Sequence, residues 1–173
     1  MPYQTSPDSL ELDREIRTFR DERRSVVLAT TDGAGLPEAS VAPCVEDAEG
    51  NLYIFVSGLA RHTSNLMATG CASALYLADE SETDNLFARK RLMLTCTAQA
   101  IPRDHPGWRR RLDELAERQG KWVETLQGLT DFQLFCLIPS TATYVRGFGQ
   151  AYRLEGEGLK RVSLVRPERP PPG

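Results

Sequence analysis

The sequence predicts a mainly β fold, an antiparallel β-barrel with α-helices inserted between its strands. Six to eight short runs rich in β-branched and aromatic residues are separated by turn residues along the 173 residues of the chain. Helical patterns occur between some of these runs, but they do not alternate regularly with the strands as the βαβ units of a parallel sheet would. The sequence has no Gly-x-Gly-x-x-Gly or Walker motif, so neither Gly-rich nucleotide-binding loop is expected.

Composition limits both the size and the partners of the protein. A chain of this length can bury one sizeable core, and 40% apolar with 26% charged residues is ordinary for a globular domain. The formal net charge of -3 provides no general basic field, so no nucleic-acid partner is expected. No apolar run is long enough to span a bilayer, and the N-terminus lacks the apolar core of a signal peptide. We therefore expect a cytoplasmic protein with no membrane partner.

The N-terminal segment predicts an amphipathic helix over residues 8–23. Leu12, Ile16 and Phe19 recur with helical spacing, whereas the opposite face carries arginines among acidic residues. The expected organisation is an N-terminal helix (residues 1–24), a barrel domain (25–165) with a helical insertion at about 106–127, and a Pro-rich tail (166–173).

The first half of the barrel is predicted to be a meander of three strands. Residues 25–31 and 37–45 are apolar or β-branched runs, and the turn between them, residues 32–35, contains two glycines that favour a hairpin. Pro43 indicates an edge or a bulge in the second strand, because proline cannot donate a hydrogen bond to the ladder. The third strand is the aromatic and β-branched run at residues 53–56.

The second half is predicted to contain further strands and one longer helix. The helix follows Pro106, with Trp108, Leu112 and Leu115 on one face and Gly120 as a stop signal. The strands predicted in this half are residues 71–77, 91–101, 131–146 with a bend or bulge at Pro139, 148–154 and 159–165.

The turn after the third strand carries the most specific chemistry in the sequence. Arg61, His62, Thr63 and Ser64 stand at the entrance of a short helix that Gly70 ends. The unpaired N–H groups at a helix start favour an anion, and a guanidinium adds a planar pair of donors that suits phosphate. These residues predict a phosphate site without a Gly-rich loop. The alternative is a surface arginine beside a Ser or Thr that caps the helix.

The cysteines indicate neither a metal site nor a redox site. No Cys-x-x-Cys pair is present, and each cysteine lies in an apolar run far from the others. We expect all of them to be buried free thiols, and we predict no metal ligand. They are Cys44, Cys71, Cys96 and Cys136.

A series of motifs resembles the flavin-binding split-barrel family that includes pyridoxamine 5'-phosphate oxidase. The motifs are, in chain order, VVLAT, DGAG, SVAP, YIFVSG and ARHTSNL. The resemblance is stronger to the haem-utilisation branch of that family, and it is carried further by NLFARKRLML, DFQLFCLIP and YVRGFGQAY. It extends from about Ser25 to Leu154, and the block that contains the ARHTSNL turn is the most specific part.

This resemblance implies a homodimer of six-stranded antiparallel split barrels, with two flavin mononucleotide (FMN) sites at the dimer interface. The family positions that hold the FMN phosphate match Arg61 and His62, and Thr63 and Ser57 are candidates for further donors. The remaining cofactor-binding positions implied by the resemblance are Ser40, Val41 and Ala42 at the isoalloxazine edge, Val56 with Ser57 under the ring and ribityl chain, and Arg91 near the subunit boundary.

The resemblance favours an FMN-dependent oxidoreductase that acts on a small-molecule substrate, and no residue pattern identifies its catalytic groups. The alternative is a haem-binding protein in iron acquisition. Some members of that branch ligate haem iron with a His near the C-terminus, but this sequence has only His62 and His105. A third possibility is a dimeric barrel without catalytic activity. Pyridoxamine phosphate oxidation is not expected, because the Arg-x-His pattern near the end of those oxidases is absent.

Overall fold

The eight strands form one antiparallel sheet whose first six strands close into a barrel. The structure is a computed structural model, and it describes residues 9–165. The sheet order is β3-β2-β1-β4-β5-β6-β7-β8, and a further pairing of β3 with β6 closes the barrel, as predicted. The strands are β1 (Ser25–Thr31), β2 (Pro37–Glu46), β3 (Leu52–Ser57), β4 (Cys71–Leu77), β5 (Arg91–Ile101), β6 (Phe132–Gly147), β7 (Gln150–Glu155) and β8 (Arg161–Leu164).

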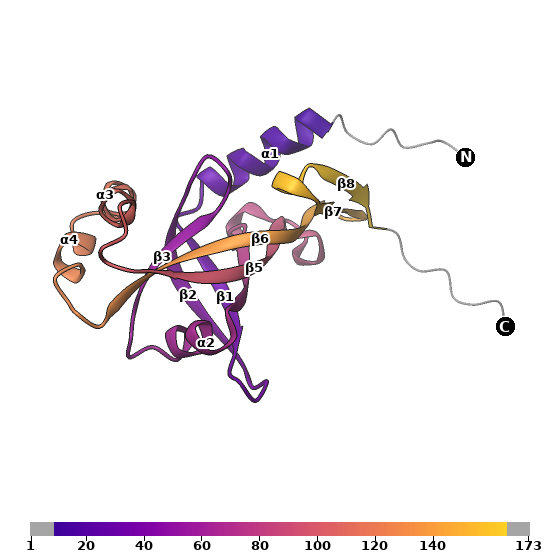
Figure 1. Ribbon diagram of the computed structural model, residues 1–173. Helices are drawn as coiled ribbons and strands as arrows, with labels where there is room; N and C mark the ends of the chain where they lie inside the picture. Colours follow the sequence, from indigo (N-terminus) through magenta and orange to yellow (C-terminus); the bar gives the residue numbers. More distant parts are fainter. Residues whose placement is uncertain (1–8, 166–173) are drawn as a thin grey trace, which may run out of the picture.

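Helices lie at both ends of the barrel and beside it (Figure 1). Helix α1 and helix α2 occupy opposite ends, while α3 and α4 lie to one side, next to β3. The α-helices are α1 (Ser9–Asp21), α2 (Arg61–Thr69), α3 (Trp108–Gln119) and α4 (Trp122–Leu126). Three short 3-10 turns complete the secondary structure of the described residues, at Glu80–Glu82, Leu86–Ala88 and Glu157–Leu159.

Helix α1 confirms the amphipathic pattern at the N-terminus. Leu12, Ile16 and Phe19 are buried and belong to the same hydrophobic core as the barrel interior. The predicted helix began at residue 8, which lies outside the described residues. Through this apolar stripe, α1 packs against one end of the barrel.

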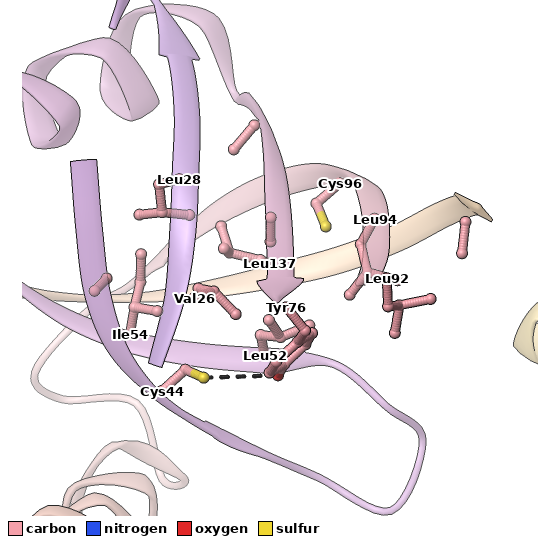
Figure 2. Packing of buried hydrophobic residues seen from close by; sticks show 14 of the residues in the cluster. Val26, Leu28, Cys44, Leu52, Ile54, Tyr76, Leu92, Leu94, Cys96 and Leu137 are labelled. Carbon is pink, nitrogen blue, oxygen red and sulfur yellow. Dashed lines mark hydrogen bonds between the residues drawn. The ribbon is translucent and has the colours of Figure 1, made fainter. Parts of the chain in front are cut away.

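The barrel interior is filled by alternate residues of its strands. Leu28, Leu52, Ile54 and Leu94 are fully buried, and Figure 2 shows them together inside the barrel, where they come from β1, β3 and β5. This alternation is the period of two of a strand with one face on the core, and it is clearest in β1, β4 and β5. A second cluster packs α3 and α4 onto the outside of β3 and β6, and it consists of Phe55, Trp108, Leu112, Leu115, Val123 and Leu134.

Pro43 marks a change in the pairing of β2. The strand pairs with β1 along Pro37 to Pro43, but it pairs with β3 only from Cys44 to Glu46. On the β3 side, the stretch up to Pro43 is therefore an edge, as the proline predicted. This early separation of β2 from β3 opens the barrel near α2.

Strand β6 is long because it serves two partners. Its first part, Phe132–Leu137, pairs with β3, and its last part, Ala142–Gly147, pairs with β7. Thr95 of β5 lies opposite Thr141, but the next residue, Cys96, lies opposite Pro139. This shift of register confirms the predicted irregularity at that proline.

Two strand predictions were wrong at their starts. β7 begins at Gln150 instead of residue 148, because Phe148 and Gly149 form the turn, where Gly149 has a φ of 69°. β8 begins at Arg161 instead of residue 159, because a 3-10 turn occupies the preceding residues. The helical insertion is divided into α3 and α4 at Gly120, whose φ is 94°.

The outer face of the barrel carries two rows of uncharged residues across five strands. Residues directly opposite in an antiparallel pair project from the same side of the sheet. Val41 is 63% exposed and Met93 is 37% exposed in the first row. The rows are Val41, Val27, Leu75, Met93 and Thr143, and Ala39, Ala29, Ser73, Thr95 and Thr141.

The cysteine prediction holds for three residues and fails for one. Cys44, Cys96 and Cys136 are buried free thiols, but Cys71 is exposed because it stands at the start of β4 on the outer face. Burial raises the pKa of the Cys44 thiol to about 11 and that of Cys96 to about 12, so both remain protonated at neutral pH. No helix of the described residues has the length and apolar character needed to cross a membrane.

Candidate functional site

The predicted anion site lies where β3 ends and α2 begins. Strand β3 ends at Ser57, and α2 starts at Arg61 with Ala60 in the N-cap position. Ala60 offers no side-chain cap, so no Ser or Thr caps the helix as the alternative expected, although the Arg61 side chain does lie at the surface. Ser64 instead donates its hydroxyl to the carbonyl of Arg61 (2.8 Å). The first N–H groups of a helix have no acceptor within the helix, so they are suited to an anion.

Two of the predicted phosphate donors hold the turn in place. The Thr63 hydroxyl donates to the Ser57 carbonyl (2.6 Å), and Thr63 is buried at 2% exposure. The Ser57 hydroxyl donates to a carboxylate oxygen of Asp131 (2.8 Å) and accepts a hydrogen bond from the N–H of Leu59 (3.1 Å). Both side chains therefore position the start of α2 in this structure.

Asp131 opens the DFQLFCLIP motif that carries part of the family resemblance, but the sequence did not identify it as a site residue. It immediately precedes β6, and its carbonyl accepts a hydrogen bond from the N–H of Gly58 (2.8 Å). A Cβ atom on Gly58 would lie 2.8 Å from the same carbonyl oxygen, closer than side-chain atoms are found. Gly58 is thus the one signal in the sequence that could have indicated a close backbone approach at this turn.

Arg61 faces a carboxylate from the neighbouring strand. Its Nε lies 3.7 Å from Oε2 of Glu38, near the start of β2. The Arg61 side chain is 68% exposed and that of Glu38 is 28% exposed. Although Glu38 Oε2 is buried, it accepts no hydrogen bond from any described residue. The guanidinium is therefore available to solvent and only loosely paired.

His62 stands next to Arg61 and also faces Glu38. Burial lowers the pKa of His62 from its ordinary value of 6.5, and the Glu38 carboxylate acts in the opposite direction. The imidazole is therefore mostly neutral at neutral pH, and an anion bound beside it would favour its charged form.

Neutral polar groups lie beneath α2. The Asn65 amide donates to the Thr30 hydroxyl (3.0 Å), and both residues are buried. The buried hydroxyl of Ser40 has no hydrogen-bond partner among the described residues. Together with Glu38, these groups give the α2 end of the barrel a polar lining, in contrast to the apolar interior shown in Figure 2.

The other predicted positions are spread over the barrel. Val41 projects outward from β2, whereas Ala42 and Val56 are buried in the core at 1% and 5% exposure. Arg91 pairs with Leu77 at the end of β4 remote from α2, and its guanidinium donates to the carbonyl of Arg89 (2.9 Å). A single chain thus brings together the residues near α2 but not Arg91.

The chemistry available at α2 is oxyanion binding. An arginine, a histidine and the start of a helix converge there, and none of the described residues forms a cluster of three or more metal-ligating side chains. Two surface hollows flank Phe19 along α1, and neither is lined by a predicted site residue. In a single chain, the residues at the start of α2 therefore form only one side of a site, which is open to solvent.

Comparisons with known proteins agree on the family. The sequence profile of the pyridoxamine 5'-phosphate oxidase family matches residues 12–146. Heme oxygenase HutZ from Vibrio cholerae is 39% identical over 161 residues, which cover 92% of this chain and 91% of that protein.

Solved structures share the fold. HutZ, described as a heme storage protein of Vibrio cholerae, has a TM-score of 0.71 with 40% identity, over 75% of this chain and 90% of its own. ChuZ from Campylobacter jejuni has a TM-score of 0.83 with 26% identity, over 96% of this chain and 68% of its own. The chain belongs to the pyridoxamine 5'-phosphate oxidase family, and its likeness to HutZ places it in the haem-utilisation branch of that family.

Proposed function

We propose that this protein binds haem and serves in haem utilisation. The observation that carries the proposal is the 39% identity with heme oxygenase HutZ over 92% of the chain. That extent includes the barrel and therefore the start of α2, where Arg61 and His62 lie.

The residues of this chain fit the chemistry of haem in two respects. Haem carries two carboxylates, for which Arg61 and the first N–H groups of α2 are suitable partners. Its iron takes an axial ligand, and an imidazole from this sequence has to come from His62 or His105. The Nδ1 atom of His105 accepts a hydrogen bond from the N–H of Gly107 (3.0 Å), which leaves Nε2 as the ligating atom.

A haem titration followed in the Soret band tests this proposal. We expect saturable binding of one haem per chain, and a changed Soret spectrum when the ligating histidine is replaced in His62→Ala or His105→Ala. Unchanged binding after loss of both histidines would exclude an imidazole ligand from this chain. Absence of binding to the unmodified protein would contradict the proposal itself.

FMN binding in an oxidoreductase is the second candidate, and the geometry of α2 favours it. Arg61, His62 and the helix start form a site of the kind that binds phosphate. The flavin would supply the redox chemistry, while the chain would bind and orient it for a small-molecule substrate.

An FMN titration of the purified protein tests the second candidate. The Arg61→Ala substitution should weaken FMN binding by about 1.5–3 kcal/mol, which is the contribution of one charge-assisted hydrogen bond. Arg109→Ala is the matched control, because Arg109 is 70% exposed on α3, away from α2. Failure of the purified protein to bind added FMN would rule this candidate out.

We further propose that the protein is a homodimer with the cofactor sites at its interface. The two uncharged rows across β2, β1, β4, β5 and β6 support this, since Val41 and Met93 are exposed there without a neighbouring charge in either row. A second copy packed on this face would bury both residues and would add a second wall to the open α2 site.

Light scattering coupled to size-exclusion chromatography tests the dimer. A carboxylate in Val41→Asp would be buried without a partner, so the protein should elute as a monomer. Val165→Asp is the matched control, because Val165 is 47% exposed beyond the end of β8. Monomeric unmodified protein would contradict the proposal.

A further inference from the structure

Glu38 lies where an anionic ligand at α2 would have to bind. Its Oε2 atom is 3.7 Å from Nε of Arg61, and its charge also acts on His62. The remaining polar pair beneath α2, Thr30 and Asn65, is neutral, and its two members are bonded to each other. Arg61 and His62 at the start of α2 thus already face a carboxylate that belongs to the chain itself.

The contact between Glu38 and Arg61 is loose. A separation of 3.7 Å is too long for a hydrogen bond, and the Arg61 side chain is 68% exposed. The buried Oε2 atom receives no hydrogen bond from the described residues, and an unsatisfied buried acceptor is unfavourable. Little therefore holds Arg61 to Glu38, and the guanidinium can turn toward another oxyanion.

We infer that Glu38 is an internal competitor for Arg61, and that a ligand oxyanion binds at α2 by taking the guanidinium from Glu38. The inference rests on the proposed function, since it names the residue that sets the affinity of the same site. Phosphate and carboxylate groups share this chemistry, so FMN and haem would both be affected. A guanidinium that faces Glu38 has to leave that carboxylate before it can pair with a ligand oxyanion, so Glu38 weakens binding of either ligand through Arg61.

Removal of the Glu38 charge should strengthen binding. We expect Glu38→Gln to bind inorganic phosphate, FMN and haem roughly fivefold more tightly than the unmodified protein, as calorimetry or spectral titration would measure. Glu49→Gln is the matched control, because it makes the same change in net charge in the exposed turn after β2, at the other end of the barrel. Its affinities should equal those of the unmodified protein.

Arg61→Ala provides a double-mutant cycle. In that background, the Glu38→Gln substitution should improve phosphate binding by much less than fivefold, because the guanidinium for which Glu38 competes is gone. An equal gain in both backgrounds would mean that Glu38 acts by general charge alone, and it would overturn the inference.

A proton NMR titration of His62 gives a readout that needs no cofactor. Because Glu38 acts to raise the pKa of His62, the pKa of that residue should fall in Glu38→Gln. Added inorganic phosphate should raise it again, and more strongly in Glu38→Gln than in the unmodified protein.

The outcomes separate the inference from the proposed function. Tighter phosphate binding by Glu38→Gln, with no binding of haem or FMN to any variant, would support the competitor role and refute the proposed cofactors. Phosphate binding that is unchanged or weaker in Glu38→Gln, or absent from every variant, would overturn the inference. If Glu38→Gln does not fold, Glu38→Ala is the second variant and should show the same gain.

Discussion

Strand β2 carries a glutamate near each end, and each glutamate faces an arginine from a helix. At the α1 end, Arg20 donates to Glu46 at 2.8 Å, and the two side chains are only 11% and 21% exposed. At the α2 end, Arg61 lies 3.7 Å from Glu38, with exposures of 68% and 28%. The two sites share one strand and one pair of residue types but differ in how tightly the charges are held.

The α1 end is a closed network. Arg20 also donates to the carbonyl of Gly50 (2.9 Å), and the Tyr76 hydroxyl donates to Glu46. Cys44 lies 3.6 Å from that hydroxyl (Figure 2). Burial acts to lower the pKa of Arg20, but the interactions with Glu46 and Tyr76 together outweigh it, and the net shift is upward. The Arg20 and Glu46 charges are thus mutually satisfied and serve to fix α1 on the barrel.

The α2 end leaves its groups incompletely satisfied. Glu38 Oε2 and Ser40 Oγ are buried without a partner among the described residues, while the Arg61 guanidinium is exposed. An arginine that fixes a structure is buried and fully hydrogen-bonded, whereas an arginine that binds a ligand has to remain accessible. The difference between the two ends therefore separates a structural ion pair from a candidate binding site.

The largest expected effect comes from breaking the closed network. Arg20→Ala leaves the Glu46 carboxylate partly buried without its partner, so it should lower the free energy of unfolding by about 3–5 kcal/mol. Urea denaturation measures this change. Arg61→Ala is the matched comparison and should change stability by less than about 0.5 kcal/mol, because its ion pair is exposed. Equal losses of stability in Arg20→Ala and Arg61→Ala would contradict the distinction between a structural ion pair at α1 and a binding site at α2.

The next effect concerns the turn that positions α2. Gly58→Ala places a Cβ atom 2.8 Å from the Asp131 carbonyl oxygen, so the turn has to move away from β6. We expect the free energy of unfolding to fall by about 1–3 kcal/mol. Gly33→Ala is the control, since no atom lies within 4 Å of its added Cβ. A Gly58→Ala protein as stable as this control would show that the close approach is unimportant.

A smaller effect is expected from one hydroxyl of the closed network. Tyr76→Phe removes the donor to Glu46 but keeps the ring, so it should cost about 1–2 kcal/mol in thermal or urea unfolding. Ser64→Ala removes a hydroxyl on the exposed face of α2 and should be nearly neutral. A neutral Tyr76→Phe would mean that Arg20 alone satisfies Glu46.

The smallest effect is a pH dependence at the α2 end. The pKa of His62 is lowered by burial from 6.5, so the unfolded chain takes up a proton more readily than the folded chain. The contribution of His62 to stability is complete above pH 6.5 and is lost as the pH falls through the lower, folded pKa. His62→Gln should flatten the stability profile in that window, and urea midpoints measured from pH 7.5 to 5 would show it. An identical profile in both proteins would contradict the burial of this imidazole.

The sequence was sufficient for most of the fold because the strands carry regular signals. Residues 25–31, 71–77 and 91–101 are runs of apolar and β-branched residues that begin after a glycine or a charged residue, and the structure has strands with those same bounds. The errors at β7 and β8 arise because an apolar residue, Phe148 or Leu159, lies in the turn before the strand, so that a local pattern cannot distinguish the turn from the strand start.

The site was only partly predictable because its partners are distant in sequence. Arg61 and His62 could be found from their place at a helix start. Glu38 reaches Arg61 only through the barrel pairing, and Asp131 likewise reaches Ser57, from which it is separated by 74 positions. No periodicity or motif connects such residues before the topology is known.

A crystal structure of the protein with its bound cofactor, haem or FMN, would test most directly whether the α2 end is the binding site. We predict that a carboxylate or phosphate of the cofactor contacts the Arg61 guanidinium, and that Glu38 has lost its contact with Arg61. A cofactor bound with its anionic groups elsewhere, while Arg61 still faces Glu38 or bulk solvent, would contradict this assignment.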